Sequence, residues 1–151
     1  MSLKIGEEVP DFTLKDQNGQ AFRIESMKGK HPFVIYFYPK DNTPGCTKEA
    51  CSFRDKYEDF TDLGAEVIGI SADVTTTHQK FANKYNLPFT LLSDPNREVA
   101  KKFGVKNNIF GLLPGRETYV IDKNGKVAMV FNSINTDKHI YKALMTLKKI
   151  K

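Results

Sequence analysis

The chain has 151 residues, of which 40% are hydrophobic and 27% charged, a balance typical of one globular domain and not of a disordered or fibrous chain. Its net charge of +5 comes from scattered lysines, without the basic stripe and interleaved aromatic residues that nucleic-acid binding requires. No apolar run is long enough to span a bilayer. We therefore expect a single domain over residues 1–151 that binds neither nucleic acid nor a membrane.

The first elements along the chain are predicted to be a hairpin, a buried strand and a helix. Residues 12–24, FTLKDQNGQAFRI, alternate apolar and polar side chains around Asn18-Gly19, which is typical of a hairpin turn. Residues 32–39, PFVIYFYP, form a nearly continuous apolar run, which predicts a strand buried on both faces. From Thr47 onward apolar residues recur at helical spacing until Gly64 ends the pattern.

The middle of the chain is predicted to alternate strands and helices. Residues 75–86, TTTHQKFANKYN, have the spacing of a helix that begins with Thr75 or Thr76 as its N-cap. On this helix we expect His78 to lie on the surface, since no acid or nucleophile stands beside it in the sequence. Two further buried strands and a short helix are predicted at AEVIGISA, FTLLSD and NREVAKKFG (residues 65–72, 89–94 and 96–104).

The last elements complete an α/β pattern. RETYVID and VAMVFN (residues 116–122 and 127–132) form a predicted hairpin through Asn124-Gly125, and residues 136–150 form a terminal helix. The order of elements predicts an α/β domain with a mixed central sheet, flanked by helices and preceded by a β-hairpin. A strand followed by a cysteine at the start of a helix is the arrangement of a thioredoxin-like fold.

The chain contains only two cysteines, Cys46 and Cys51, both in the stretch YPKDNTPGCTKEAC. The first residues, MSLKIGEEVPDF, have no apolar core of signal-peptide length, so we expect a cytosolic protein, in which stable structural disulfides are rare. Zinc requires a second pair of ligands, and the three histidines are isolated along the chain. The sequence therefore predicts no metal site.

The two cysteines occupy different positions in the predicted helix. Cys51 adjoins the apolar face marked by Ala50 and Phe53, so burial explains it as well as chemistry does. Cys46 follows a Pro-Gly pair and falls in the first turn, where free backbone N–H groups and the helix dipole lower the pKa of a thiol. This is the position in which a reactive cysteine is expected.

The spacing of the cysteines is not that of a thioredoxin-type Cys-x-x-Cys site. On an ideal helix, residues five apart differ by about 7.5 Å along the axis and about 140° around it. Their Cα atoms then lie roughly 8.6 Å apart, beyond the ~7 Å that a disulfide spans. A bond between Cys46 and Cys51 therefore requires the first turns of the helix to unwind, which suits a redox cycle with two conformations better than a structural staple.

Several motifs identify the chain as a member of a known family. The pattern Pro39-x-x-x-Thr43-x-x-Cys46 resembles the peroxidatic motif of peroxiredoxins. The whole stretch is similar to the peroxiredoxin Q, or bacterioferritin comigratory protein, subgroup, in which a second cysteine lies five residues on. Further similar motifs cover most of the chain: GEEVPDF, GISAD, LPFTLLSD and RETYVID.

The resemblance implies a thiol peroxidase without metal, haem or flavin. Cys46 would attack the terminal oxygen of hydrogen peroxide or an organic hydroperoxide and become a sulfenic acid. Cys51 would resolve it as an intramolecular disulfide, which thioredoxin or a similar dithiol would reduce. The resemblance does not say which hydroperoxide or which reductant is used, and we expect a monomer or at most a weak dimer.

Transition-state stabilisation is also needed, because lowering a thiol pKa raises the thiolate fraction at pH 7 at most about thirtyfold, roughly 2 kcal/mol. By resemblance, the donors to the cleaving O–O bond are Arg116 and the Thr43 hydroxyl, with backbone N–H groups near Gly45 and Cys46, and Pro39 shields the pocket. From the residues alone, two other interpretations stay open: Arg116 as an exposed ion-pairing residue, and Thr43 as a helix cap.

Three other features stay open on sequence grounds. Glu49 falls within the first turn of the helix, where the helix dipole favours a negative charge. This interpretation is preferred to a helper role in catalysis. The apolar stretch from Ile109 to Leu113 has three interpretations: ordinary core, a wall of the peroxide pocket, or a docking surface for a partner. Two other functions compete with the peroxidase: a thiol–disulfide oxidoreductase acting on proteins, and a non-enzymatic redox sensor or holdase. Catalytic consumption of peroxide distinguishes the three functions.

Overall fold

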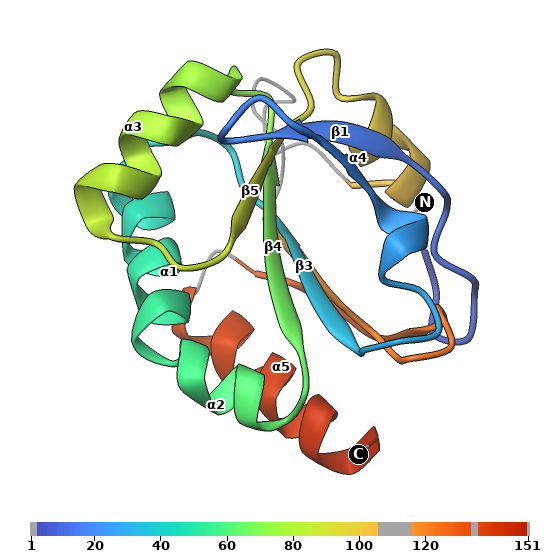
Figure 1. The fold of residues 1–151 in the computed structure, drawn as a ribbon. Coiled ribbons are helices and arrows are strands. Elements are labelled where there is room, and N and C mark those ends of the chain that lie inside the picture. The colour runs from blue at the N-terminus through green and yellow to red at the C-terminus, as the bar shows by residue number, and fades with distance from the viewer. Residues whose placement is uncertain (1–2, 106–115, 134–135, 151) are drawn as a thin grey trace.

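The computed structural model describes residues 3–105, 116–133 and 136–150. These residues form a seven-stranded mixed sheet in the order β2-β1-β5-β4-β3-β6-β7, with helices on both faces (Figure 1). The predicted α/β architecture with its N-terminal hairpin is confirmed. The apolar stretch from Ile109 to Leu113 lies outside the described residues.

The centre of the sheet is parallel and its edges are antiparallel. β3 pairs in parallel with β4, and β4 with β5, while β6 and β1 join this centre in antiparallel fashion. The parallel strands are long apolar runs because both of their faces are covered. The strands are β1 (Thr13–Asp16), β2 (Ala21–Arg23), β3 (Phe33–Phe37), β4 (Glu66–Ser71), β5 (Thr90–Ser93), β6 (Glu117–Ile121) and β7 (Val127–Asn132).

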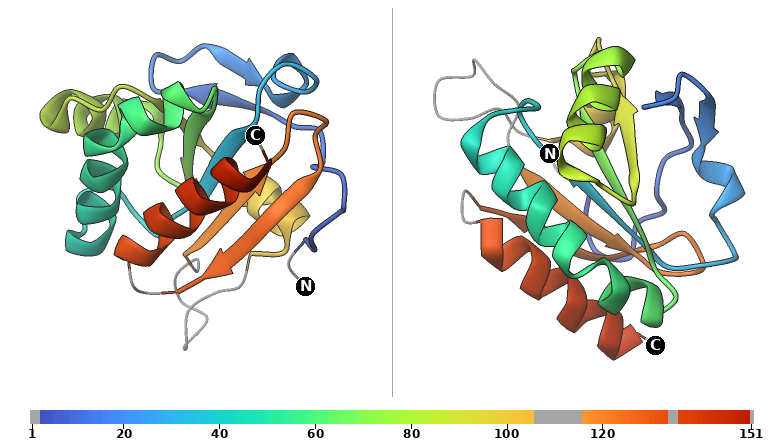
Figure 2. Two further views of the ribbon diagram at one scale, coloured as in Figure 1. Left: turned by 90° about the horizontal axis from the view of Figure 1, so that it is seen from below. Right: turned by 60° about the vertical axis from the view of Figure 1, so that its left-hand side comes forward.

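Helices cover the two faces unequally (Figures 1 and 2). Alternate residues of β3 point to opposite sides, so Tyr36 belongs to a core under the larger helical layer and Ile35 to a core on the other face. The larger layer contains α1 (Pro44–Asp55), α2 (Tyr57–Asp62), α3 (Thr75–Tyr85) and α5 (Thr136–Ile150). The opposite face carries α4 (Glu98–Phe103) and the short 3-10 helix η1 (Ile24–Ser26).

Two details of the helices differ from the sequence prediction. The single helix expected to run up to Gly64 is two helices, because the backbone of Lys56 leaves the helical region at φ −106° and ψ 8°. Neither proline nor glycine marks this break, so the apolar spacing did not reveal it. The N-cap of α3 is Val74, not Thr75 or Thr76, and no side chain caps that helix.

The loop between β3 and α1 positions the cysteine-bearing helix. α1 starts with Pro44, whose fixed φ suits the first helical position, and Thr43 precedes it in extended conformation. Asn42 has φ 65°, in the left-handed region that asparagine tolerates better than most residues. Residues 38–43 therefore follow a defined path from the central sheet to the start of α1. Within the described parts of the chain, none of the helices is long and apolar enough for a membrane span.

Candidate active site

Cys46 is the third residue of α1 and its side chain is buried. Only 1% of the residue is exposed, and it packs in the core that contains Ala50 and Phe53 from the same helix. At this position the backbone N–H groups of the first helical turn are unused by the helix itself and favour an anion. Cys46 thus lies at a helix start, as the sequence predicted, and its role as a reactive thiol stays a prediction.

Arg116, just before β6, brings a positive charge to this sulfur. Its Nη2 donates a hydrogen bond to Cys46 Sγ at 3.3 Å, and its Nη1 donates to Glu49 Oε1 at 2.5 Å. Burial alone would lower the pKa of Arg116, but Glu49 and Cys46 beside it raise that pKa overall, so the guanidinium stays charged. Arg116 is therefore not an exposed ion-pairing residue but a shared donor to a thiol and a carboxyl group.

Gly45 allows Arg116 to approach the helix. A Cβ atom at position 45 would lie 3.1 Å from Arg116 Nη2, closer than nearly all real contacts of a Cβ atom. The glycine before the cysteine therefore has a packing reason that the sequence did not suggest. A side chain at this position would press on the guanidinium that reaches Cys46.

Glu49 is a site residue that sequence reasoning undervalued. It is 0% exposed and lies one turn after Cys46, on the same buried side of α1. Burial raises its pKa from 4.5 to about 7, although the charge and hydrogen bond of Arg116 oppose that rise. Glu49 therefore changes its charge near neutral pH, which a carboxylate placed only to favour the helix dipole would not do.

His139 of α5 lies beside the carboxylate oxygen of Glu49 that Arg116 does not bind. Its Nδ1 lies 3.8 Å from Glu49 Oε2, an atom for which no hydrogen-bond partner is found among the described residues. His139 Nε2 donates to the Ser133 carbonyl at 2.6 Å, so Nδ1 accepts from the Thr118 hydroxyl at 2.7 Å. Burial lowers the pKa of His139 to about 4, and the ring is neutral at pH 7. It shields Glu49 from water without neutralising it.

Thr43 and Pro39 lie in the loop before α1. Thr43 occupies the N-cap position, but its hydroxyl donates to the Lys40 carbonyl at 2.8 Å instead of capping the helix. The cap interpretation of its side chain is therefore wrong. With its hydrogen engaged, the hydroxyl can accept a hydrogen bond from an O–H group without rearrangement. Pro39 is half-buried directly after Tyr38, and its shielding role stays a prediction.

Cys51 points to a different side of α1 from Cys46. Both cysteines are free thiols, and Cys51 is partly exposed whereas Cys46 is buried. This difference agrees with the rotation of about 140° expected for residues five apart on a helix. As α1 is folded here, Cys51 cannot meet Cys46.

The sequence prediction for His78 is wrong. His78 is 0% exposed, and its Nδ1 lies 2.6 Å from Oδ2 of Asp41 in the loop before α1. With Asp73 these residues place donor atoms within 4.8 Å of one another, a spacing that can hold a metal ion. Hydrogen bonds already engage those atoms, since Asp73 Oδ2 accepts from the Asp41 N–H at 2.8 Å and from the Ser71 hydroxyl at 2.6 Å. The cluster is a hydrogen-bond network that joins residues far apart in the sequence.

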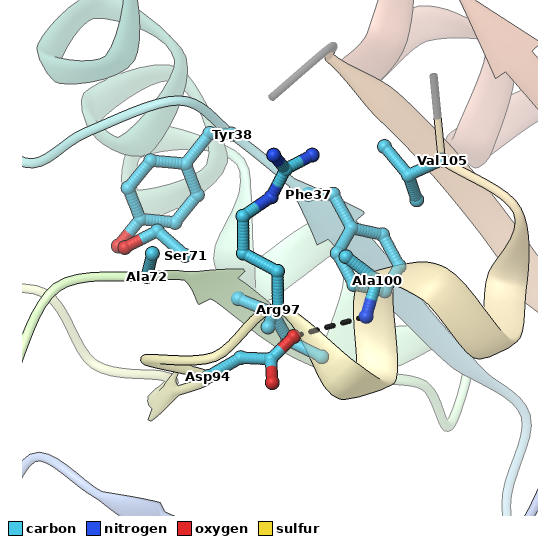
Figure 3. A pocket seen from close by; sticks show the side chains of 9 residues that line it. Phe37, Tyr38, Ser71, Ala72, Asp94, Arg97, Ala100 and Val105 are labelled. Atoms are coloured by element: carbon cyan, nitrogen blue, oxygen red, sulfur yellow. Dashed lines mark hydrogen bonds between the residues drawn. The ribbon is translucent and has the colours of Figure 1, made fainter. Parts of the chain in front are cut away.

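A small cavity lies beside this loop, at the carboxyl ends of β3, β4 and β5 (Figure 3). Tyr38 and Ser71 border it on one side, and Arg97 extends across it from the start of α4. Asp94 forms its floor and accepts a hydrogen bond from the Ala100 N–H at 2.9 Å. Its volume of about 10 Å³ is near the minimum for one water molecule, too small for a substrate.

Comparison with known proteins identifies the family of this chain. The AhpC/TSA family matches residues 5–130. The chain belongs to the AhpC/TSA family. It is 55% identical over 147 residues to the chloroplastic peroxiredoxin Q of Sedum lineare, covering 97% of this chain and 78% of that protein. The Arabidopsis thaliana peroxiredoxin Q is 56% identical over 144 residues, 95% of this chain and 66% of that protein.

Solved peroxiredoxin structures have the same fold. Peroxidoxin BcpB of Mycobacterium tuberculosis is 43% identical and superposes with a TM-score of 0.91 over 99% of both chains. Peroxiredoxin Q of Xanthomonas campestris is 31% identical with a TM-score of 0.84, covering 91% of this chain and 90% of that one. The predicted thioredoxin-like fold and the resemblance to peroxiredoxin Q are confirmed, and the chain is a thiol peroxidase.

The expectation of a cytosolic protein is corrected by the same comparison. The peroxiredoxin Q proteins of Sedum lineare, Populus jackii and Arabidopsis thaliana, each more than half identical to this chain, are chloroplast proteins. Free thiols indicate a reducing compartment, and more than one compartment of a cell can be reducing. The composition of the chain therefore did not decide between the cytosol and an organelle.

Replacing Gly45 by alanine should separate activity from stability. Alanine is the better helix former by about 0.5–1 kcal/mol, so the fold should not weaken. The new methyl group should displace Arg116 and slow the reaction of Cys46 with hydrogen peroxide about tenfold or more, because small misplacements at a reacting centre are costly. The rate and the unfolding free energy of Gly45→Ala measure both effects. In an Arg116→Ala background, Gly45→Ala should change the rate no further, and an additional loss there would contradict the explanation.

Glu49 should make stability depend on pH. A pKa raised from 4.5 to about 7 means that folded protein holds a proton that unfolded protein has released. This contribution to stability is complete below pH 4.5 and is lost as pH rises through about 7. Relative to Glu49→Gln, the reduced wild-type chain should lose up to about 1.4 kcal/mol per pH unit between pH 5 and 7. Urea unfolding at several pH values measures this, with Glu58→Gln, an exposed carboxyl on α2, as the control. Parallel pH profiles for wild type and Glu49→Gln would contradict the raised pKa.

Proposed function

We propose that this peroxiredoxin reduces hydroperoxides at Cys46 and resolves the oxidised sulfur with Cys51. The observation that carries the proposal is the hydrogen bond of 3.3 Å from Arg116 Nη2 to Cys46 Sγ. A guanidinium at that distance stabilises the thiolate, which is the nucleophile. The Xanthomonas campestris bacterioferritin comigratory protein, 31% identical, has been studied for its alkyl peroxide reduction activity, which supports hydroperoxides as the substrate class.

In the first step the thiolate of Cys46 attacks the terminal oxygen of the hydroperoxide. A sulfur–oxygen bond forms, the oxygen–oxygen bond breaks, and the other oxygen leaves with the electron pair and takes up a proton. Negative charge moves from sulfur toward the leaving oxygen, and Arg116 is placed to follow it as donor. Near pH 7 a protonated Glu49 keeps this buried group of charges close to neutral. The products are the sulfenic acid of Cys46 and water or an alcohol.

In the second step Cys51 reduces the sulfenic acid. Its thiol attacks the Cys46 sulfur, a disulfide forms and water leaves. A thioredoxin-type dithiol then supplies the two electrons that restore both thiols, as peroxiredoxins require. Because the two cysteines lie on different sides of α1, the first turns of this helix must open between the two steps.

The burial of Cys46 supports this function over thiol–disulfide exchange with proteins. With 1% of the residue exposed, its sulfur is out of reach of a disulfide on a folded protein. The alternative oxidoreductase would need an exposed attacking cysteine. The sensor or holdase function would need no transition-state donor such as Arg116.

Serine substitutions separate the roles of the two thiols. Cys46→Ser should abolish peroxide turnover because it removes the nucleophile. Cys51→Ser should undergo one fast reaction with hydrogen peroxide at the wild-type rate and then recycle slowly or by another route, because only the resolving thiol is missing. Rapid quenching followed by mass spectrometry of the intact chain distinguishes sulfenic acid from disulfide. Equal loss of the first reaction in both variants would contradict the assignment.

Oxidation should open the first turns of α1. The disulfide requires several i→i−4 hydrogen bonds to break, each worth about 0.5–1.5 kcal/mol net, a cost that the covalent bond can offset. Amide hydrogen exchange over residues 46–55 should therefore be much faster in oxidised than in reduced protein. Residues 140–147 of α5 serve as an internal reference and should change less. Unchanged protection of residues 46–55 after oxidation would exclude the local-unfolding mechanism.

A further inference from the structure

A buried hydrogen-bond network, centred on the side chain of Asp41, fixes the loop between β3 and α1. Asp41 is 3% exposed, and its two carboxylate oxygens have different partners. Oδ1 accepts from the Tyr38 hydroxyl at 2.6 Å, and Oδ2 lies 2.6 Å from His78 Nδ1. Burial raises the pKa of Tyr38 well above 10, so this hydroxyl keeps its proton and acts as donor.

The network also reaches β4 and β5, which follow each other on one side of β3 in the sheet. The Asp41 N–H donates to Asp73 Oδ2 at 2.8 Å, just after β4. His78, in the first turn of α3, places its Nε2 3.0 Å from the carbonyl oxygen of Leu92 in β5. Asp73, after the end of β4, and His78 of α3 thus both bind Asp41 in the loop that leads to Cys46, and His78 is itself anchored to β5.

The contacts of His78 require two protons on the pair that it forms with Asp41. The Leu92 carbonyl can only accept, so His78 Nε2 carries a hydrogen. The contact of 2.6 Å between His78 Nδ1 and Asp41 Oδ2 needs a second hydrogen, whichever atom carries it. The pair is net neutral in both arrangements, which suits a fully buried site. Without that second hydrogen, two lone pairs would face each other and repel the loop.

Asp41 is well placed to control the start of α1. It lies one residue before Asn42, whose left-handed φ of 65° turns the chain, and two before Thr43, the N-cap. A turn of this kind persists when surrounding contacts determine it. A fixed Asp41 therefore fixes the direction in which α1 begins, and with it the position of Cys46 relative to Arg116.

We propose that His78 is a positioning residue of the peroxide site. Through Asp41 it holds residues 38–43 in the conformation in which Cys46 meets Arg116, and it thereby opposes the opening that brings Cys51 to Cys46. The inference rests on the proposed function and extends it to α3, a helix that contributes no side chain to the sulfur. Loss of the contact should slow the reaction with peroxide and favour the conformation that forms the disulfide.

Three variants isolate the contact between His78 and Asp41. His78→Phe keeps a planar ring but removes both hydrogen bonds. His78→Asn places an amide nitrogen close to the former Nδ1, so it can still donate to Asp41 while losing the Leu92 carbonyl. Phe81→Leu is the matched control, because Phe81 is 1% exposed on the same helix, packs in the core and takes part in none of the hydrogen bonds of the network.

The first measurement is the rate at which reduced protein reacts with hydrogen peroxide. The chain contains no tryptophan, so rapid quenching and mass spectrometry are used in place of tryptophan fluorescence. His78→Phe should react about tenfold or more slowly than wild type. His78→Asn should recover most of that loss, and Phe81→Leu should react like wild type even though it is less stable.

The second measurement is the fate of the sulfenic acid under excess peroxide. It either condenses with the Cys51 thiol to a disulfide and water, or reacts with a second hydrogen peroxide to a sulfinic acid and water. His78→Phe should raise the share of disulfide relative to sulfinic acid, because α1 opens more readily. A general loss of stability would not produce this shift, and Phe81→Leu should keep the wild-type ratio.

The outcomes decide between positioning and mere packing. The proposal would be overturned if His78→Phe matched Phe81→Leu in both the peroxide rate and the product ratio. It would also be overturned if His78→Asn reacted with peroxide no faster than His78→Phe. If the wild-type chain consumed no peroxide, the proposed function would fail instead. Amide hydrogen exchange over residues 38–43 of the reduced variants is an independent test of whether His78 holds this loop. Exchange in this loop should be faster than in wild type for His78→Phe and unchanged for the other variants. Asp41→Ala provides the same test from the other partner should His78→Phe fail to fold.

Discussion

A single, partly buried guanidinium joins the two acidic groups of the candidate site. Arg116 donates to Cys46 and to Glu49, two acidic groups that compete for one positive charge in a site with little water. Burial raises the pKa of Glu49 to about 7, although the charge of Arg116 and its hydrogen bond oppose this rise. Glu49 and the sulfur of Cys46 are thus connected through Arg116.

The proposed cycle makes opposite demands on α1. In its first step α1 is folded, because the folded helix places Cys46 against Arg116. In its second step the start of α1 is open, because residues five apart on a folded helix are too far apart for a disulfide. The loop from 38 to 43 lies at the junction between these states. Hydrogen bonds attach this loop to α3 and to the end of β4, and α3 to β5. In the proposed cycle these bonds favour the folded state of α1 over the open state.

Local sequence patterns predicted most elements but not their details. Hairpin turns at Asn18-Gly19 and Asn124-Gly125 and the buried strand β3 follow from residue type and alternation, which are local properties. The break at Lys56 was missed because no proline or glycine marks it. The expectation of a cytosolic protein was wrong because the lack of a signal-peptide pattern does not distinguish the cytosol from an organelle.

The sequence by itself determined that the chain has two cysteines, how far apart they are, and that the first of them lies at the start of a helix. These follow from the geometry of one helix, and the family motifs added Arg116 and Thr43. Only the tertiary structure decided that Glu49, His78 and His139 belong to the site or support it. Their partners lie 67, 37 and 21 residues away along the chain, in elements that meet only when the sheet has formed. A histidine or a glutamate on a helix has the same local pattern whether it faces water or a buried partner, so its role depends on what the fold packs against it.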